Sequence, residues 1–196
     1  MELTTGRLVL RELEEGDWPA VLAYQSDPRY LRYYEWTERT EEDVRAFVRM
    51  LVGLREEEPR TKFQLAVALR EGGQLIGNCG IRVNNPATRE ANIGYELDPR
   101  QWGRGYATEA ARAILGFGFA ELHAHRVWAE CVADNAGSAR VLEKLGMRRE
   151  AHFREDRWYK GRWWDTLIYA ILDHEWRGRG CAGQLTARSG EADGTG

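Results

Sequence analysis

Residues 98–110 have the composition of an anion-binding loop. The segment leaves a predicted strand, passes two closely spaced glycines, Gly103 and Gly105, and enters a predicted helix. Glycine lets the backbone approach a ligand closely, and the first turn of a helix offers unpaired N–H groups at the positive end of the helix dipole. This combination predicts a binding site for a phosphate or pyrophosphate group, and therefore a phosphorylated ligand.

Two common phosphate-binding motifs do not fit this segment. A dinucleotide fingerprint requires a third glycine where Thr108 stands, and it belongs to the first strand and helix of a parallel unit. A P-loop requires Gly-Lys-Ser/Thr after four intervening residues, and the segment does not supply it. A plain tight loop, whose glycines only turn the chain and cap a helix, is the alternative. The strand before the loop and the helix after it favour the anion site.

The elements that must position this loop follow from the pattern of apolar and turn residues. Alternation and turn residues predict strands at residues 6–12, 63–69, 75–83, 91–97, 126–132, 147–159 and 162–172. Helix-start residues and helical spacing predict helices at residues 17–22, 40–51, 106–121 and 135–145. The order of these elements predicts an α/β (α+β) domain with a mixed sheet and helices on its faces.

Length and composition predict one globular domain. The chain has 196 residues with a formal charge of −3, and it lacks the basic excess typical of nucleic-acid binding. We expect one domain at residues 1–176 and a glycine-rich, disordered tail at residues 177–196. No segment has the length of a signal peptide's apolar core or of a membrane span, so we expect a cytoplasmic protein. Cys79, Cys131 and Cys181 lack the spacing of a zinc site, and no metal is expected.

Two separated motifs resemble one enzyme family. Arg100-x-x-Gly103-x-Gly105 matches the Arg/Gln-x-x-Gly-x-Gly/Ala signature of the GNAT (Gcn5-related) N-acetyltransferases, and residues 103–110 look like the RimJ/RimL ribosomal-protein acetyltransferase branch. Residues 135–147 are similar to that branch's Asn-x-x-Ser-x-x-x-x-x-Lys-x-Gly-Phe segment, with Met147 in place of the aromatic residue. Residues 5–11 and 93–97 also resemble the branch. The resemblance spans most of residues 4–176 and implies a mixed, mostly antiparallel sheet of about seven strands flanked by about four helices.

The resemblance implies transfer of an acetyl group from acetyl-CoA to a primary amine by direct attack in a ternary complex. The CoA pyrophosphate would lie against the backbone of residues 103–107, and the pantetheine arm would bond the backbone around Leu97 like an added strand. The residues that it implies for the cofactor are Leu97, Arg100, Trp102, Gly103, Arg104, Gly105, Tyr106, Ala107, Thr108, Asn135 and Ser138. For Asn135 and Ser138 the alternative is an ordinary helix start, in which asparagine caps the first turn.

Amine attack on a thioester requires a neutral amine, stabilisation of the developing oxyanion, and a proton for the leaving thiolate. Glu96 is the candidate base because it stands on the strand that ends at the loop; a water molecule, or an exposed Glu96 without a catalytic role, is the alternative. Many members of the family that the chain resembles carry an acid where Asn92 stands. The absence of an acid here counts against direct base catalysis from this position. Ser138 is the candidate acid by its position in the branch pattern. Cys131, inside an apolar strand, is expected to be a core residue.

The acceptor amine is expected beside Glu35 and Trp36, in an acidic and aromatic segment that borders the acceptor pocket in this family. A helix N-terminus and a core edge explain the same residues equally well. The branch favours a protein N-terminal α-amine, and polyamines, amino sugars and amino acids are the alternatives. A CoA-binding module without turnover is a second hypothesis, and an unrelated phosphate-loop enzyme is a third. The chain is expected to be a monomer or a homodimer.

Overall fold

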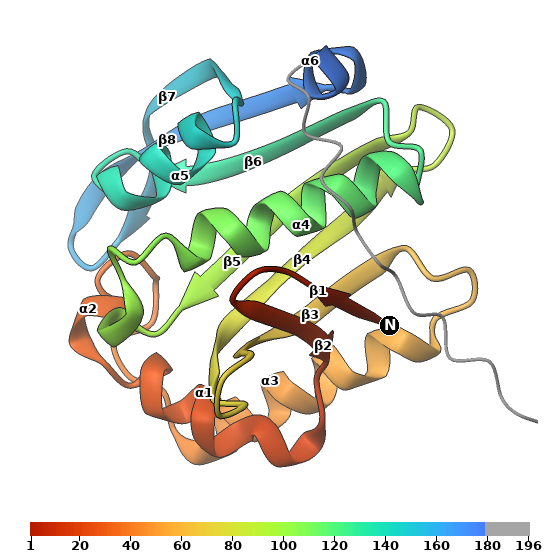
Figure 1. The fold of residues 1–196 in the computed structure, drawn as a ribbon. Helices are drawn as coiled ribbons and strands as arrows, with labels where there is room; N and C mark the ends of the chain where they lie inside the picture. Colours follow the sequence, from red (N-terminus) through yellow and green to blue (C-terminus); the bar gives the residue numbers. More distant parts are fainter. Residues whose placement is uncertain (179–196) are drawn as a thin grey trace, which may run out of the picture.

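A computed structural model describes residues 1–178 and shows one sheet with helices on both faces (Figure 1). The eight strands lie in the order β1-β2-β3-β4-β5-β6-β8-β7. Their bounds are β1 Glu2–Thr4, β2 Leu8–Glu12, β3 Lys62–Leu69, β4 Leu75–Asn85, β5 Glu90–Leu97, β6 Arg126–Val132, β7 Arg148–Tyr159 and β8 Arg162–Leu172. Neighbouring strands are antiparallel except β5 and β6, which are parallel. The expected mixed, mostly antiparallel sheet is confirmed.

The described residues contain six α-helices and three short 3-10 helices. The α-helices are α1 Trp18–Gln25, α2 Pro28–Leu31, α3 Glu41–Gly53, α4 Tyr106–Ala120, α5 Ala136–Lys144 and α6 Asp173–Gly178. The 3-10 helices are Glu15–Asp17, Leu54–Glu56 and Pro99–Gln101. The start of α3 shows why its sequence forms a helix, since Thr40 and Asp43 form a reciprocal capping box and Val44, Val48 and Leu51 bury one face.

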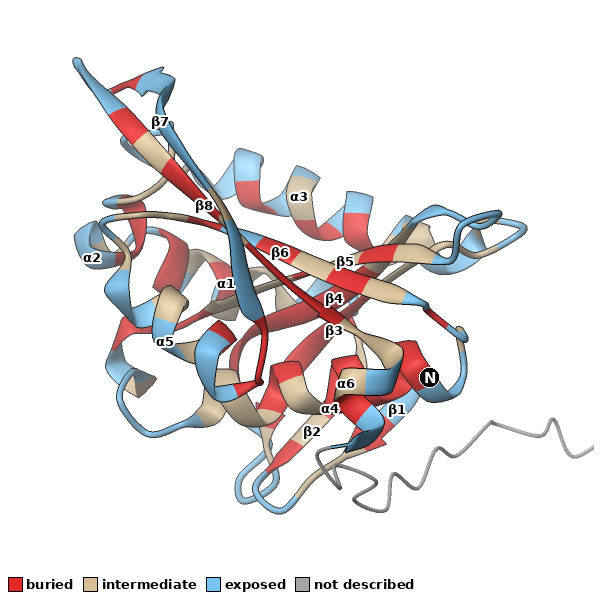
Figure 2. Cartoon of the chain, turned by 90° about the horizontal axis from the view of Figure 1, so that it is seen from above, coloured by how far each residue is buried: buried red, intermediate tan, exposed pale blue. Residues whose placement is uncertain are grey.

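Two apolar clusters cover the two faces of the sheet, and alternation along β3 separates them. Leu65 and Val67 belong to the larger cluster, which includes residues of α4, β1 and β2. Ala66 between them belongs to the cluster of α1, α2 and α3. Figure 2 shows the sheet between α3 and α4 in the same way. Helix α4 packs against β2, β4 and β5, so its N-terminus is held at the end of β5.

The structure has more elements than the sequence predicts. The sheet has eight strands rather than about seven, because Glu2–Thr4 pairs with β2. Six α-helices replace about four, because α2 and α6 are too short for helical periodicity to reveal them. All seven predicted strands and four predicted helices are present, and the helix expected at residues 17–22 continues to Gln25.

The two outer strands of the sheet are unlike the inner ones. Strand β1 has three residues. Strand β7 is exposed along almost its whole length (Figure 2), and its pairing with β8 shifts register twice. In the second shift Glu155 adopts a φ of 51°, and its N–H donates to Asp165 Oδ1 at 2.8 Å. The charged edge strand therefore contains a bulge.

The end of the described chain overlaps the predicted tail by two residues. Helix α6 continues through Arg177 and Gly178, and residues 179–196, including Cys181, lie outside the described residues. Trp176 of α6 is buried and stacks on Phe119 of α4 at 5.7 Å between ring centroids. Within residues 1–178 none of the helices combines the length and apolar character needed to cross a bilayer.

Candidate active site

Strands β5 and β6 diverge after a short paired stretch, which opens a cleft in the sheet. Their parallel pairing covers only residues 90–92 opposite residues 126–128, although β5 continues to Leu97. The N–H of Asp98 bonds to the carbonyl of Ile76 on β4 at 2.8 Å, so by alternation the backbone of Leu97 faces away from β4, toward the cleft. On this side the end of β5 has no paired strand. The Leu97 carbonyl accepts from the Trp102 indole, and the Leu97 N–H faces the cleft, where a ligand can bond it.

The loop after β5 ends at the N-terminus of α4 through two left-handed glycines. Gly103 has a φ of 77°, and Gly105, the N-cap of α4, has a φ of 81°. Both angles lie in the region that L-residues adopt only with strain. The 15-residue helix that follows directs its free N–H groups and positive dipole end at this loop. This geometry is the one that an anion-binding loop requires, and the anion site stays a prediction.

Glu109 ties the first turn of α4 to the N-terminal strands. Its carboxylate accepts hydrogen bonds from the Thr5 hydroxyl at 2.7 Å, the Arg7 backbone N–H at 2.9 Å and the Arg7 guanidinium at 2.7 Å. The same guanidinium donates to the Arg104 carbonyl at 3.0 Å and lies over the Tyr106 ring. Burial alone would raise the pKa of Glu109, and the Thr5 and Arg7 hydrogen bonds overcome it and lower the pKa.

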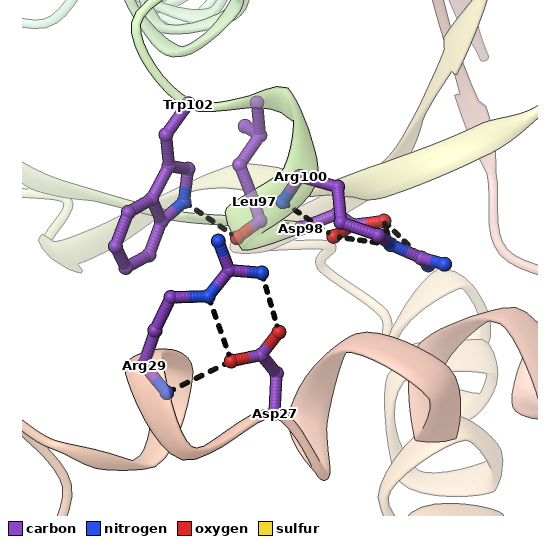
Figure 3. A network of polar contacts seen from close by, with 6 residues as sticks. All are labelled: Asp27, Arg29, Leu97, Asp98, Arg100 and Trp102. Atoms are coloured by element: carbon purple, nitrogen blue, oxygen red, sulfur yellow. Dashed lines mark hydrogen bonds and ion pairs between the residues drawn. The ribbon is translucent and has the colours of Figure 1, made fainter.

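Arg100 and Asp98 form an ion pair at the start of the same loop (Figure 3). Asp98 is buried and accepts from both the backbone N–H and the guanidinium of Arg100. Figure 3 shows a second pair, Asp27 with Arg29 at the start of α2, facing the first. The indole N–H of Trp102 donates to the Leu97 carbonyl at 2.9 Å. These bonds fix the turn between β5 and the anion loop.

A cavity of about 730 Å³ opens at the cleft and collects most of the predicted residues. Those that line it are Glu35, Trp36, Glu96, Leu97, Trp102, Gly103, Gly105, Tyr106, Ala107, Thr108, Asn135 and Ser138. Arg100 and Arg104 are not among the lining residues. The structure therefore brings the two sequence motifs and the acidic-aromatic segment to one cavity, and it places the Arg100 guanidinium on Asp98.

Glu96 lies in this cavity, and several side-chain donors, Tyr34 among them, surround its carboxylate. Its Oε1 accepts from the Tyr24 hydroxyl at 2.7 Å, from Gln25 Nε2 at 2.9 Å and from Asn78 Nδ2, and its Oε2 accepts from the Tyr30 hydroxyl. Burial, followed by the charge of Glu96, raises the pKa of Tyr24 and Tyr30, so both hydroxyls stay protonated and donate. Glu96 is thus a fixed acceptor in the cavity wall, unlike a carboxylate on a solvated face.

Ser138 lies on the opposite wall of the cleft, in the first turn of α5. Its N–H donates to Asn135 Oδ1 at 3.1 Å, so Asn135 is the helix cap as well as a cavity residue. The Ser138 hydroxyl lies 2.9 Å from the Tyr95 hydroxyl, which also bonds to the Ser138 carbonyl at 3.1 Å. Cys131 lies beside them, and burial raises the pKa of its thiol to about 11. That thiol is therefore protonated at neutral pH and is a poor nucleophile.

Stacked aromatic rings form the wall on the side of Glu35. Tyr30 stacks on Tyr34 with 4.5 Å between ring centroids, and Tyr34 stacks on Trp36 with 4.7 Å. The stack runs from the hydroxyl that contacts Glu96 to Trp36, which is 39% exposed. A cation that enters past Glu35 would contact ring faces on its way to Glu96.

Trp158 and Trp163 pack edge to face near the tip of the β7–β8 hairpin and are more than half exposed. Trp164 is buried and stacks on Tyr159, which does line the cavity. Of the three tryptophans, none is a cavity residue. Near the last hairpin the cavity wall is built by Tyr159 instead.

The cavity also contains residues that the sequence motifs do not reveal. Tyr95 is the partner of Ser138, and Gln101 has a buried side-chain oxygen with no hydrogen-bond partner in the described structure. Arg140 and Lys144 line the cavity from α5 and add positive charge near the anion loop. The two residues are four positions apart in α5, and this spacing places them on the same face of the helix. Within residues 1–178 no three His, Cys, Asp or Glu side chains are grouped to hold a metal.

A family model described as an acetyltransferase (GNAT) domain matches residues 7–148. The chain belongs to the GNAT acetyltransferase family. The uncharacterized N-acetyltransferase YnaD of Bacillus subtilis is 40% identical over 176 residues, which cover 90% of this chain and 99% of YnaD. The crystal structure of a GNAT-family acetyltransferase from Bacillus anthracis shares 35% identity with a TM-score of 0.77, covering 89% of this chain and 99% of that one. The chain is therefore a GNAT-type N-acetyltransferase that acts on amines.

More distant GNAT proteins have named acceptors. The [ribosomal protein uS5]-alanine N-acetyltransferase of Escherichia coli is 22% identical over 90% of this chain and 93% of its own. The spermidine N-acetyltransferase of Vibrio cholerae, crystallised with CoA and spermine, has a TM-score of 0.75 at 20% identity, covering 88% of this chain and 99% of that one. At these identities the likeness shows a shared fold and nothing more specific. It leaves open which acceptor this GNAT chain uses.

Proposed function

We propose that this GNAT protein transfers the acetyl group of acetyl-CoA to a primary amine in a ternary complex, and that the amine is a protein N-terminal α-amine. One observation carries the proposal. A single cavity joins an unpaired strand edge and a helix N-terminus, which suit CoA, to a carboxylate and an aromatic stack, which suit an amine. The two halves meet between Glu96 and Ser138, both of which line the cavity.

The residues present fit CoA. The backbone edge of β5 near Leu97 would bond the amides of the pantetheine arm, and the N–H groups of residues 103–107 would hold the diphosphate. Arg140 and Lys144, on the α5 side of the cavity, add charge that favours a phosphorylated ligand. Arg100 would contribute indirectly, through its ion pair with Asp98 at the base of the loop.

Acetyl-CoA supplies the thioester whose acetyl group is transferred. Glu96 Oε2, which accepts from the Tyr30 hydroxyl, would receive the proton of the amine directly or through water as the C–N bond forms. The Leu97 amide would donate to the carbonyl oxygen as it gains charge. The Ser138 hydroxyl would give a proton to the sulfur as the C–S bond breaks, and it would recover one through the Tyr95 hydroxyl.

An α-amine is the favoured acceptor because its pKa near 8 makes it easier to deprotonate at neutral pH than a lysine amine, whose pKa is about 10.4. The acidic and aromatic wall of Glu35, Tyr34 and Trp36 also supports a small cationic amine, such as a polyamine or an amino sugar. The small-amine acceptor is therefore the second candidate.

A panel of acceptors tests the proposal. Thiol release from acetyl-CoA is measured with hexapeptides that begin with Ala, Ser or Met, with their N-terminally blocked forms, and with spermidine, glucosamine and free amino acids. The fastest release is expected with a free peptide N-terminus, and blocking should abolish it. Faster release with spermidine or glucosamine would establish the small-amine alternative. If CoA raises the melting temperature and every amine fails to release thiol, the protein is a CoA-binding module.

A further inference from the structure

A chain of buried side chains connects Arg82 on β4 to Glu96. Arg82 Nη2 donates to Gln64 Oε1 at 3.0 Å, and Gln64 Nε2 donates to Asn78 Oδ1 at 2.6 Å. Asn78 Nδ2 then donates to Glu96 Oε1. Gln64 and Asn78 are buried, at 5% and 3% exposure. The chain begins at a cation on β4, runs through side chains of β3 and β4, and ends at the candidate base on β5.

A second chain approaches the same oxygen from the helical side. Arg39 Nε donates to Gln25 Oε1 at 3.1 Å, and Gln25 Nε2 donates to Glu96 Oε1 at 2.9 Å. Gln25 is 1% exposed. Two arginines on different sides of Glu96 are therefore each joined to its carboxylate through buried amides.

The direction of both chains is fixed by their ends. A guanidinium can only donate and an ionised carboxylate can only accept, so each amide must turn its oxygen toward the arginine and its nitrogen toward Glu96. Flipping Gln64 or Gln25 would place an NH₂ group against a guanidinium. Leaving a buried polar group without a hydrogen bond is unfavourable, so the chains restrict how the Glu96 carboxylate can rotate.

The two oxygens of Glu96 are used unequally. Oε1 accepts from Asn78, Gln25 and the Tyr24 hydroxyl, whereas Oε2 accepts from the Tyr30 hydroxyl. An ionised carboxylate has about four acceptor positions in all. The Tyr34 side chain also interacts with this carboxylate. Because three donors crowd Oε1, the acceptor capacity that remains lies on Oε2.

We propose that Arg82, Gln64 and Asn78 in one chain, and Arg39 and Gln25 in the other, are positioning residues that lock the Glu96 carboxylate so that Oε2 faces the acceptor amine. The inference rests on the proposed role of Glu96 in the transfer reaction. It adds that residues as far from the cavity as Arg82 set the orientation of that carboxylate. Arg82 and Gln64 do not line the cavity, so they act only through their neighbours.

The test uses Arg82→Met and Gln64→Met in the full chain, with Arg82→Lys as the conservative variant. The first readout needs no acceptor: crystal structures of wild type and variants with CoA show whether Glu96 keeps one conformation. We expect a rotated or multiple Glu96 carboxylate in both methionine variants and the wild-type conformation in Arg82→Lys. An unchanged carboxylate in Arg82→Met and Gln64→Met would overturn the proposal.

The second readout is kinetic, with the acceptor of the panel that releases thiol fastest. We expect kcat to fall about tenfold in Arg82→Met and Gln64→Met, with the KM for acetyl-CoA unchanged, because the reacting groups are misplaced. Arg82→Lys should recover most of the loss, since it keeps a cationic donor. A purely structural role would instead change the melting temperature and leave kcat unaltered in the folded fraction, which would contradict the proposal.

Two further variants separate the possible failures. Arg60→Met removes a half-buried arginine that pairs with Glu12 on the opposite face of the sheet, where α4 packs, and it should lower stability without affecting kcat. Glu96→Gln tests the proposed function itself. Wild-type kcat in Glu96→Gln would refute the role of Glu96 as base, whereas a loss in Glu96→Gln with full activity in Arg82→Met and Gln64→Met would refute only the positioning chains.

Discussion

The Ser138 hydroxyl has two close polar neighbours, the Tyr95 hydroxyl at 2.9 Å and the Cys131 thiol. Burial raises the pKa of Tyr95, so its hydroxyl stays protonated and can pass a proton to Ser138. We expect Ser138→Ala to lower kcat by about 100-fold, the low end of the range for a lost general acid, with the KM for acetyl-CoA within a few fold. Steady-state kinetics on the folded variant measures both values.

Two tyrosine variants provide the control for this prediction. Tyr95→Phe should also lower kcat, because it removes the partner of the Ser138 hydroxyl while keeping the ring. Tyr169 likewise contacts α5, through a hydroxyl bond to Glu143 at 3.3 Å, but it is not a cavity residue. Tyr169→Phe should therefore keep wild-type kcat. Equal activity of Ser138→Ala and wild type would assign the leaving-group proton to another donor.

The turn before α4 is the proposed anchor of CoA. Gly105 has a φ of 81°, and alanine there adopts a left-handed conformation at a cost of about 1–2 kcal/mol. Gly105→Ala is expected to lower the free energy of unfolding by that amount and to weaken CoA binding severalfold, because the strain moves the N–H groups of the first helical turn. Isothermal titration calorimetry and denaturant unfolding measure the two effects.

Gly72 is the matched control for Gly105. It lies in the turn between β3 and β4 with a φ of 78°, and a Cβ there meets nothing within 4 Å. Gly72→Ala should cost a similar free energy of unfolding, yet leave the Kd for CoA unchanged. If both variants weaken CoA equally, general instability rather than the geometry of the loop is responsible.

The carboxylates that join β2 to its neighbours predict the response to acid. Burial by itself raises the pKa of Glu12, Asp17 and Glu109. Hydrogen bonds lower each pKa below its ordinary value: Arg60 donates to Glu12, Arg11 donates to Asp17, and Thr5 and Arg7 donate to Glu109. A group with a lowered folded pKa stabilises the fold above its unfolded pKa, and this stability is lost as the pH falls. The melting temperature should therefore begin to drop below about pH 4.5.

Asp17→Asn separates this effect from general acid unfolding. The variant should have a lower melting temperature at pH 7 and a smaller further drop down to pH 3, because one of the three groups no longer titrates. Glu71→Gln, at an exposed position of the β3–β4 turn, should follow the wild-type curve. A wild-type acid profile in Asp17→Asn would show that the Arg11–Asp17 pair contributes no stability.

The sequence predicts the strands, the longer helices and the glycine turn before α4 because their signals are local. Strand alternation, the glycine pair and the cap at Asn135 each occupy a short segment. The partners of Glu96 were not predicted, since Tyr24, Asn78 and Tyr30 come from separate elements and meet only through tertiary packing. Helix α2 was missed although Asp27 before Pro28 is a helix-start signal, because four residues are too few for periodicity.

Trp176 is the last large buried side chain of the described domain. A chain that ends after Gly178 should have the melting temperature of the full chain, because the large buried side chain of α6 is retained. A chain that ends after Asp173 loses Trp176 and its stacking on Phe119, which is worth about 3 kcal/mol and roughly 6–12 °C. Calorimetry of the two truncations tests the predicted domain boundary. A large drop in the melting temperature of the chain that ends after Gly178 would place the domain boundary further toward the C-terminus.

The two outer strands also affect whether copies of the protein associate edge to edge at high concentration. A sheet with a long, flat rim can be extended by the backbone of another chain, which is a common route to fibres. Here β1 offers three residues, and β7 is interrupted by the outward turn at Glu155 and carries charges along its length. The protein can therefore expose Trp158 and Trp163 to solvent without presenting a template on which neighbouring copies would polymerise.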